Sequence, residues 1–230
     1  MASDIIKLKE MTGAGVLDCK KALDEANGDF DKAVASLREK GQAKALKKSA
    51  SDRIAAEGVV GSYIHLGGKI GVLVEVNCET DFAQKSERFQ ALVKDIAMHI
   101  AASNPIYVHS AEVPADILDK EREIFKNKII NEKGESILTK TRKDKTGVEI
   151  KIIDDMLDGM VKKYYQDYCL LDQSFIKEPS KTVRDIVNEA IAFVGEKITI
   201  RRFTRYEMGE GIEKQTTDFA EEVSKQMATK

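Results

Sequence analysis

The spacing of the apolar residues changes twice along this chain, and that change constrains the fold more than any other feature. Spacings of three and four residues run through positions 4–40, β-branched runs follow at 59–76, and helical spacing returns from about position 83. Three- and four-residue spacing is typical of amphipathic helices, whereas short β-branched runs beside turn residues are typical of strands. The sequence therefore predicts an α+β fold with a small helical head, a core that contains a small antiparallel sheet, and further helices.

Residues 1–54 are expected to form the helical head and a basic linker. Three short helices in about 40 residues make a bundle near the lower size limit for a core that folds by itself. Gly41 is expected to end this bundle, and residues 42–53 to form a linker or a frayed extension of the third helix. A basic run such as this one is more often a solvated face than a binding site. The three helices are expected at residues 4–11, at 16–26 and from Phe30 onward.

Residues 55–206 are expected to form the core domain. A hairpin turn at Gly67-Gly68 separates two strand-like segments, and the second of these has a nearly continuous apolar run. Such a run predicts a strand that is buried on both faces. The expected strands lie at residues 59–64, 70–76 and 197–206, and the expected helices lie at 83–102 and 181–193.

An insertion at about 114–167 is expected to form a helical hairpin that stands out from the core as an arm. Its two amphipathic helices, at 115–134 and 149–167, flank a polar and basic segment that is expected to be a turn or a disordered tip. The apolar stripes of these helices favour packing against each other over a binding face. Beyond the core, residues 207–230 are expected to form a C-terminal module with a helix at 216–228.

Charge and composition limit the classes of partner. The chain has 37 basic and 39 acidic residues and a net charge of -2. Phosphate binding usually requires a clear basic excess, so no direct nucleic-acid partner is expected, although the balance leaves room for a local basic patch. The chain lacks the basic and then apolar opening of a signal peptide, and no apolar stretch approaches the roughly 20 residues that span a bilayer. We therefore expect no membrane association and a cytoplasmic location.

Cysteine and histidine spacing gives no sign of a metal or cofactor site. Cys19, Cys78 and Cys169 are odd in number, widely spaced and without a CxxC motif, which predicts reduced thiols. The three histidines are not spaced four apart and form no HExxH pattern. The sequence also lacks the GxxxxGK[ST], GxGxxG and GxSxG motifs. We therefore expect no catalytic residue, no metal and no cofactor, and a function in binding rather than in bond-making.

One loop, Thr80-Asp81-Phe82, lies between the apolar second strand and the long helix that follows it. In a structural interpretation, Thr80 or Asp81 caps the helix and Phe82 packs beneath it. In a functional interpretation, Phe82 is exposed and inserts into a pocket of a partner, where truncation of such an aromatic side chain costs more than ~2 kcal/mol. The residues of the loop by themselves leave both interpretations open.

Over nearly its whole length the sequence resembles the elongation factor Ts family. Several long motifs occur in the family's order, which makes the resemblance specific. They are MTGAGVLDCKKAL at 11–23, NGD at 27–29, EVNCETDF at 75–82, EPSKTV at 178–183, GEGIEK at 209–214 and TDF at 217–219.

The resemblance implies a fold and a partner. The head would be a three-helix, ubiquitin-associated-like domain, and the partner would be the GTPase elongation factor Tu with GDP and magnesium bound to it. The Thr80, Asp81 and Phe82 loop would enter Tu near its nucleotide site, where Phe82 would wedge into an apolar cleft and shift the elements that hold the magnesium ion and the β-phosphate. Binding of this chain and of GDP would then weaken each other equally.

The resemblance also assigns contacts to other parts of the chain. The head would grip the outer face of the nucleotide domain of Tu, and the C-terminal helix would dock on the same domain. His65 is a candidate contact to the third domain of Tu, although a partly buried histidine of the sheet is an equally good interpretation. The head contacts are expected around Leu8, Lys9, Val16 and Leu17.

This chain departs from the longer family members, which carry two related core subdomains, because it has one. We therefore hypothesise that two copies of the chain pair as a homodimer, through the sheet edge or the helical arm, and supply by symmetry what the longer forms hold in one chain. Two other functions remain open from the sequence. The head and core together are compatible with a ubiquitin-associated-like adaptor for another partner, and the basic tip of the arm, at Lys140, Arg142, Lys143 and Lys145, is compatible with a contact to ribosomal RNA.

Overall fold

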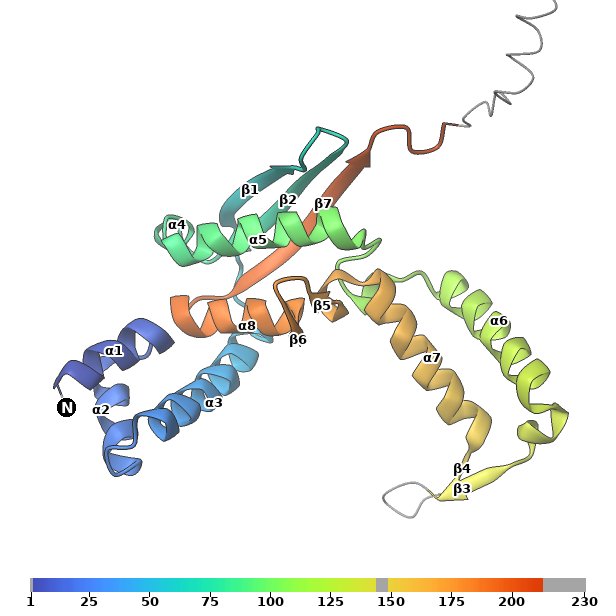
Figure 1. Ribbon diagram of the computed structural model, residues 1–230, viewed down its shortest axis with the longest axis horizontal. Coiled ribbons are helices and arrows are strands. Elements are labelled where there is room, and N and C mark those ends of the chain that lie inside the picture. The colour runs from blue at the N-terminus through green and yellow to red at the C-terminus, as the bar shows by residue number, and fades with distance from the viewer. Residues whose placement is uncertain (1, 144–148, 213–230) are drawn as a thin grey trace, which may run out of the picture.

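The computed structural model describes residues 2–143 and 149–212 of the chain. Figure 1 shows a central sheet and its helices, with a helical head and a helical arm that diverge from the same side of this core. The mixture of helices with small antiparallel sheets confirms the α+β fold predicted from the sequence. The helix expected at 216–228 lies outside the described residues.

Three helices build the head: α1 (Ala2–Thr12), α2 (Val16–Glu25) and α3 (Phe30–Ser49). Asn27 and Gly28 both have positive φ, which turns the chain sharply, and the Asp29 side chain then caps α3 by accepting a hydrogen bond from the Lys32 amide at 3.1 Å. The apolar faces of the three helices enclose a small core of their own. Its buried residues are Leu8, Cys19, Ala22, Leu23, Ala33, Val34 and Leu37.

The prediction that Gly41 ends the head is wrong, because α3 continues without a break through Gly41 to Ser49. A Cβ atom at Gly41 would lie 3.3 Å from the Cβ atom of Ala192, so this glycine allows close packing against a helix of the core. Four residues later, Ala45 is fully buried in the main core. Tertiary packing of this extension outweighs the roughly 1 kcal/mol that a glycine costs inside a helix.

The central sheet has three antiparallel strands in the order β1 (Glu57–Ile64), β2 (Ile70–Cys78) and β7 (Ile198–Glu207). In this register Val74 of β2 lies opposite Gly61 on one side and Phe203 on the other. The prediction that the second strand is buried on both faces is wrong, since Leu73 is 50% exposed while its neighbours Val72 and Val74 are buried. The core helices cover one face of the sheet and leave the other face open.

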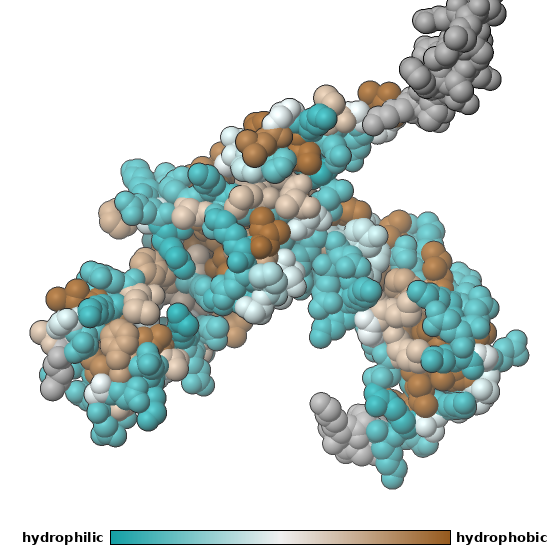
Figure 2. Space-filling view, viewed as in Figure 1, coloured by the Kyte–Doolittle hydropathy of each residue, from teal (hydrophilic) through white to brown (hydrophobic). Residues whose placement is uncertain are grey.

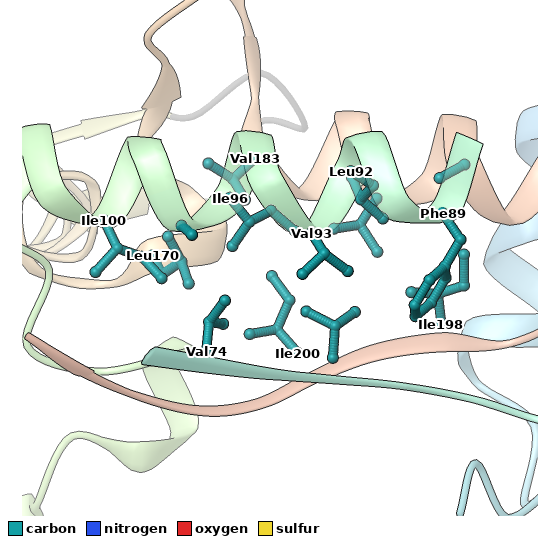
Figure 3. Packing of buried hydrophobic residues seen from close by; sticks show 14 of the residues in the cluster. Val74, Phe89, Leu92, Val93, Ile96, Ile100, Leu170, Val183, Ile198 and Ile200 are labelled. Carbon is teal, nitrogen blue, oxygen red and sulfur yellow. The ribbon is translucent and has the colours of Figure 1, made fainter. Parts of the chain in front are cut away.

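The covered face of the sheet packs against α5 (Glu87–Ser103) and α8 (Val183–Val194). Figure 3 shows Val93, Ile96 and Ile100 of α5 above Val74 of β2 and Ile200 of β7. Complete burial of side chains of this size stabilises the fold by about 1.5–3 kcal/mol each. The helix axis can approach the sheet closely because a Cβ atom at Gly61 would lie only 2.3 Å from Val93 Cγ1.

The arm is an antiparallel pair of helices, α6 (Ala115–Lys133) and α7 (Ile152–Tyr168). Their apolar stripes pack against each other in two clusters, as the sequence predicts. The buried residues are Val113, Tyr164 and Cys169 near the core, and Ile129, Ile137 and Ile153 near the tip.

The sequence predicts a turn or a disordered tip on the arm, and the described residues form an ordered turn, so the disordered alternative is wrong for them. The tip contains a short 3-10 turn, η2 (Glu135–Leu138), and a two-stranded ladder of β3 (Thr141–Lys143) and β4 (Glu149–Lys151). Ile137 of η2 is buried between the two helices, and this apolar anchor holds the turn against them. Lys145 lies outside the described residues.

A buried polar group joins the arm to the core. Short elements surround it, namely η1 (Ser110–Glu112), η3 (Leu170–Asp172), β5 (Ser174–Phe175) and β6 (Glu178–Thr182). The Gln173 side chain donates to the Asp167 carbonyl at 2.8 Å and pairs with His99 Nε2 at 3.0 Å. Burial lowers the pKa of His99, and its Nδ1 atom accepts a hydrogen bond from the Ile176 amide at 3.3 Å. A neutral His99 that carries its proton on Nε2 satisfies both contacts.

Candidate functional site

The Thr80-Asp81-Phe82 loop connects β2 to α5 through a one-turn helix, α4 (Asp81–Gln84), at one end of the core (Figure 1). Thr80 Oγ1 accepts a hydrogen bond from the Ala83 amide at 3.3 Å, so Thr80 caps α4. The prediction that Thr80 or Asp81 caps the long helix is wrong, because α5 begins later and Ser86 caps it by accepting a hydrogen bond from the Phe89 amide at 3.3 Å. Phe82 is 83% exposed, so the interpretation in which its ring packs beneath the helix is wrong. The loop therefore combines a structural cap with an aromatic side chain that this chain leaves in solvent.

Buried neighbours on both sides hold Phe82 outward. Cys78 before it and Ala83 after it belong to the main core, and Cys78 Sγ donates to the Thr80 carbonyl oxygen at 3.2 Å. After α4, the Ser86 hydroxyl donates to the Ala83 carbonyl oxygen at 2.8 Å and closes the turn. Because the backbone is fixed on either side, the Phe82 ring has no route into the core. Its transfer from water into a pocket of a partner would be worth about 1.5–3 kcal/mol.

Asp81 adds a negative charge beside the exposed ring. Its carboxylate pairs with the Lys85 ammonium one turn later, at 2.8 Å, and both side chains are largely exposed. The Lys85 hydrogen bond lowers the pKa of Asp81, so the carboxylate is ionised at neutral pH. The tip therefore presents an aromatic ring next to an anion.

Two further carboxylates that sequence reasoning missed hold the base of the loop. Glu196, in the turn between α8 and β7, accepts hydrogen bonds from the Thr80 amide at 3.0 Å and the Thr80 hydroxyl at 2.7 Å. Glu79 accepts from the Lys197 amide at 2.8 Å and the Arg53 guanidinium at 2.9 Å, and the Lys197 amide is the main cause of the lowered pKa of Glu79. Glu196 is 116 residues from Thr80, and no local pattern in the sequence signals the contact.

The structure separates the head residues that the resemblance implied as contacts. Leu8 is 0% exposed in the core of the head, so it is a packing residue and its side chain cannot touch a partner. Lys9 is exposed, and Val16 and Leu17 are 53% and 76% exposed at the start of α2. Of the four predicted contact residues, Lys9, Val16 and Leu17 are therefore available on the surface of the head.

The turn before α2 also joins the head to the core. Gly13 has a φ of 68°, and a Cβ atom there would lie 2.7 Å from the Phe193 ring of α8. The Arg88 guanidinium of α5 lies 5.6 Å from the centre of the same ring, within cation–π range. Phe193 thus packs between the head and α5, which fixes the turn at the start of α2 relative to the core.

His65 lies in the turn between β1 and β2 and is exposed, so the interpretation as a partly buried histidine of the sheet is wrong. Its Nδ1 atom lies 3.2 Å from the Tyr63 hydroxyl. The exposed apolar side chains at this end of the sheet are Ile64, Leu66, Tyr206 and Met208. Brown atoms gather over the β1–β2 hairpin in Figure 2.

The structure does not bring the three predicted contact regions together. His65 lies before the first residue of β2 and Phe82 lies after its last residue, so the length of that strand separates them. The head helices α1 and α2, which carry the exposed head residues, lie on the side of α8 away from the β1–β2 hairpin (Figure 1).

Among the described residues, no group of three or more histidine, cysteine, aspartate or glutamate side chains is arranged to hold a metal ion. All three cysteines are free and buried. Burial raises the pKa of Cys169 to about 11. No helix within residues 2–143 or 149–212 has the length and apolar character needed to cross a membrane.

Comparison with known proteins identifies the relatives of this chain. The family model described as Elongation factor TS matches residues 7–210. The chain is 53% identical over 226 residues to elongation factor Ts of Desulforamulus reducens, covering 98% of this chain and 97% of that protein. It is also 53% identical over 226 residues to elongation factor Ts of Acetivibrio thermocellus, covering 98% of both chains. With elongation factor Ts of Geobacter sulfurreducens it shares 50% identity over 223 residues, which cover 97% of this chain and 96% of that protein.

Proposed function

Because the chain belongs to the elongation factor Ts family of translation elongation factors, we propose that it is the guanine-nucleotide exchange factor of elongation factor Tu. It acts by binding and makes or breaks no covalent bond. The observation that carries the proposal is the exposure of Phe82 on a loop whose backbone is fixed on both sides. A soluble chain gains nothing for its own stability by leaving such a ring in water, whereas a partner pocket gains its burial.

The Asp81–Phe82 tip enters Tu near the nucleotide and the magnesium ion. Phe82 occupies an apolar cleft between helices of Tu, and this occupation displaces the elements that hold the cation and the β-phosphate. Loss of the cation leaves the charge of the diphosphate without its neutralising partner, so GDP leaves faster. Binding of GTP then displaces this chain, because nucleotide and exchange factor weaken each other by the same factor.

The remaining contacts follow the exposed residues. Lys9, Val16 and Leu17 of the head bind the nucleotide domain of Tu, while Leu8 supports them from inside the head. His65 and the apolar side chains around it bind the third domain of Tu from the opposite end of the sheet. The fixed spacing between head, loop and hairpin lets one rigid chain hold two domains of Tu in the open arrangement.

We also propose that two copies of the chain pair through the open face of the central sheet. Val60 and Leu73 point away from the core helices and are exposed. Glu75 lies among them with Arg201 and Arg202, at 2.9 and 2.7 Å, which provides polar contacts inside an apolar surface. Sedimentation should show a mass of two chains that falls to one chain in a Leu73→Glu variant. A single-chain mass for the unaltered protein at all concentrations contradicts the pairing without affecting the exchange function.

The exchange function is tested by the release of fluorescent GDP from Tu after mixing with this protein. The unaltered chain should accelerate release, and Phe82→Ala should remove most of the acceleration. Ile124→Ala is the matched control, since it truncates another exposed apolar side chain, on α6 of the arm. It should accelerate GDP release from Tu as much as the unaltered chain does. No acceleration by the unaltered chain would overturn the assignment and favour an adaptor role.

A further inference from the structure

We propose that Glu196 is a positioning residue for nucleotide exchange, because its carboxylate holds Thr80 so that α4 presents Phe82 in the orientation that binds the partner. The inference rests on the proposed function of the Phe82 loop. It adds a residue 116 positions along the chain, in the turn between α8 and β7, to a loop site that the sequence places wholly within residues 80–82.

Both oxygens of Glu196 are used on a single residue. One accepts from the Thr80 amide at 3.0 Å, and the other accepts from the Thr80 hydroxyl at 2.7 Å. Because an ionised carboxylate only accepts hydrogen bonds, the hydroxyl must direct its single proton at Glu196. Its lone pairs then face the Ala83 amide, 3.3 Å away, which is the capping contact of α4. The carboxylate therefore sets the direction of the hydroxyl that caps the helix.

A second carboxylate makes the same connection in the reverse direction. Glu79 accepts from the Lys197 amide at 2.8 Å, so the residues 79–80 and 196–197 each give a carboxylate to a backbone amide of the other. We call these four residues the crossed clamp. Two links from the crossed clamp reach the chain that leaves the head, since Glu79 pairs with Arg53 at 2.9 Å and Lys197 Nζ donates to the Ser51 carbonyl oxygen at 2.5 Å.

The loop requires such support because α4 has only four residues. Forming a single helical turn fixes many backbone angles for one hydrogen bond, so a turn of this length is unfavourable in isolation. A loop that spends only part of its time in the binding conformation binds more weakly in proportion to that fraction. By holding the turn in place, the crossed clamp removes an ordering cost that would otherwise arise when Phe82 enters Tu.

Substitutions at Glu196 separate this role from a purely structural one. Glu196→Ala leaves the Thr80 amide and hydroxyl without their acceptor, and we expect it to slow catalysed GDP release by about tenfold or more, because two charge-assisted hydrogen bonds are lost. Glu196→Gln keeps one acceptor oxygen but aims an amide group at one of the two donors, and we expect an intermediate loss of about threefold. Glu189→Ala is the matched control, because Glu189 is a carboxylate of α8 that pairs with Lys181 and does not touch the loop.

The decisive comparison is a double-mutant cycle with Phe82→Ala. If Glu196 acts through the placement of Phe82, then Glu196→Ala should slow release by less than about twofold in a chain that already lacks the ring. An equal loss in both backgrounds would show that Glu196 acts elsewhere and would overturn the proposal. Unaltered release by Glu196→Ala alone, in a protein whose release depends on Phe82, would also overturn it while leaving the proposed function intact.

A second readout needs no partner. In the free protein, hydrogen exchange of the Thr80 and Ala83 amides should be at least several-fold faster in Glu196→Ala than in Glu189→Ala, while the Ala33 amide of the head keeps its protection. Unchanged protection of the Thr80 and Ala83 amides would overturn the positioning role. If the unaltered chain fails to accelerate GDP release from Tu, the proposed function is wrong. Hydrogen exchange of the Thr80 and Ala83 amides still tests whether Glu196 positions the loop.

Discussion

The Phe82 loop and the tip of the arm are both short turns that project from the body, yet they treat their apolar side chains in opposite ways. The arm tip encloses Ile129, Ile137 and Ile153 and leaves Leu138, at 37% exposure, less than half as exposed as Phe82. The loop buries its small neighbour Ala83 and leaves Phe82, its one large apolar side chain, in solvent. Apolar residues that pack against each other stabilise the element that carries them, whereas a single ring held away from the core is available to a partner. The difference favours a stabilising role for the arm tip and supports the binding role that we propose for the loop.

The largest expected effect is on the arm. Ile129→Ala removes a fully buried side chain between α6 and α7 and should destabilise the arm by about 2–5 kcal/mol. Hydrogen exchange of the α6 and α7 amides should rise accordingly. GDP release from Tu should be unchanged, and a marked loss of release would show that the arm takes part in exchange.

Truncation in the loop should give the reverse result. Phe82→Ala should cost more than ~2 kcal/mol in the transition to the exchange complex, a loss of about 30-fold or more in release. The thermal midpoint should be unchanged, because the ring contributes almost nothing to the folded chain. A lowered midpoint with unaltered release would place Phe82 with the packing residues of the arm tip.

Two threonine caps provide a matched pair with smaller effects. Thr80 caps α4 and Thr182 caps α8, where Asp185 completes a capping box. Loss of such a cap costs about 1 kcal/mol. Thr80→Val should therefore slow release several-fold without lowering the thermal midpoint, and Thr182→Val should lower the midpoint without slowing release. The opposite result, a lowered midpoint for Thr80→Val and slowed release for Thr182→Val, would contradict the separation of binding from stability.

Low pH should destabilise the folded chain through His99, which is buried where the arm meets the core. Burial lowers the pKa of His99 in the folded chain, so the unfolded chain takes up a proton at higher pH. His99 therefore favours the folded state fully above its unfolded pKa of about 6.5, and this contribution falls as pH decreases from there toward the lowered folded value. Unfolding measured at pH 7.5 and 5.5 should show a larger loss for the unaltered chain than for His99→Gln. His65→Gln is the control, since His65 is exposed, and should behave like the unaltered chain.

The smallest effect is expected at the exposed pair of the loop. Lys85→Ala removes the partner of Asp81, but both side chains are largely in solvent. We expect the rate of GDP release from Tu to change by less than about twofold. Any difference between the variant and the unaltered chain should disappear at high salt, because salt screens an exposed ion pair. Asp116 and Lys120 form the corresponding pair of the arm, and Lys120→Ala should likewise change the rate of GDP release from Tu by less than about twofold.

The sequence predicted the elements that repeat a local pattern and missed those that depend on distant packing. The helices of the head and arm and the three strands of the sheet follow from periodicity. The separate turn α4, and with it the cap of α5 at Ser86, does not follow from any local pattern that the sequence analysis used. Gly41 was misjudged because its close approach to Ala192 is a tertiary contact. The open face of β2 was missed because an apolar run does not reveal on which side helices will lie.

The candidate site divides in the same way. The motif at 80–82 and its exposed ring were predicted, because resemblance to a family marks local motifs. Leu8 was placed among the contact residues although its side chain is fully buried, since the motif gives position and not burial. Glu196 was missed altogether, because only the turn after α8 brings it to Thr80.

Mutual weakening between this chain and GDP on Tu gives the most direct test of the account. Titration calorimetry of the chain with Tu should show much weaker binding when GDP and magnesium are present than when Tu is empty. In Phe82→Ala the ratio of these two affinities should shrink by about tenfold or more, because the ring transmits the coupling. The same ratio in Phe82→Ala as in the unaltered chain would contradict the claim that Phe82 displaces the nucleotide.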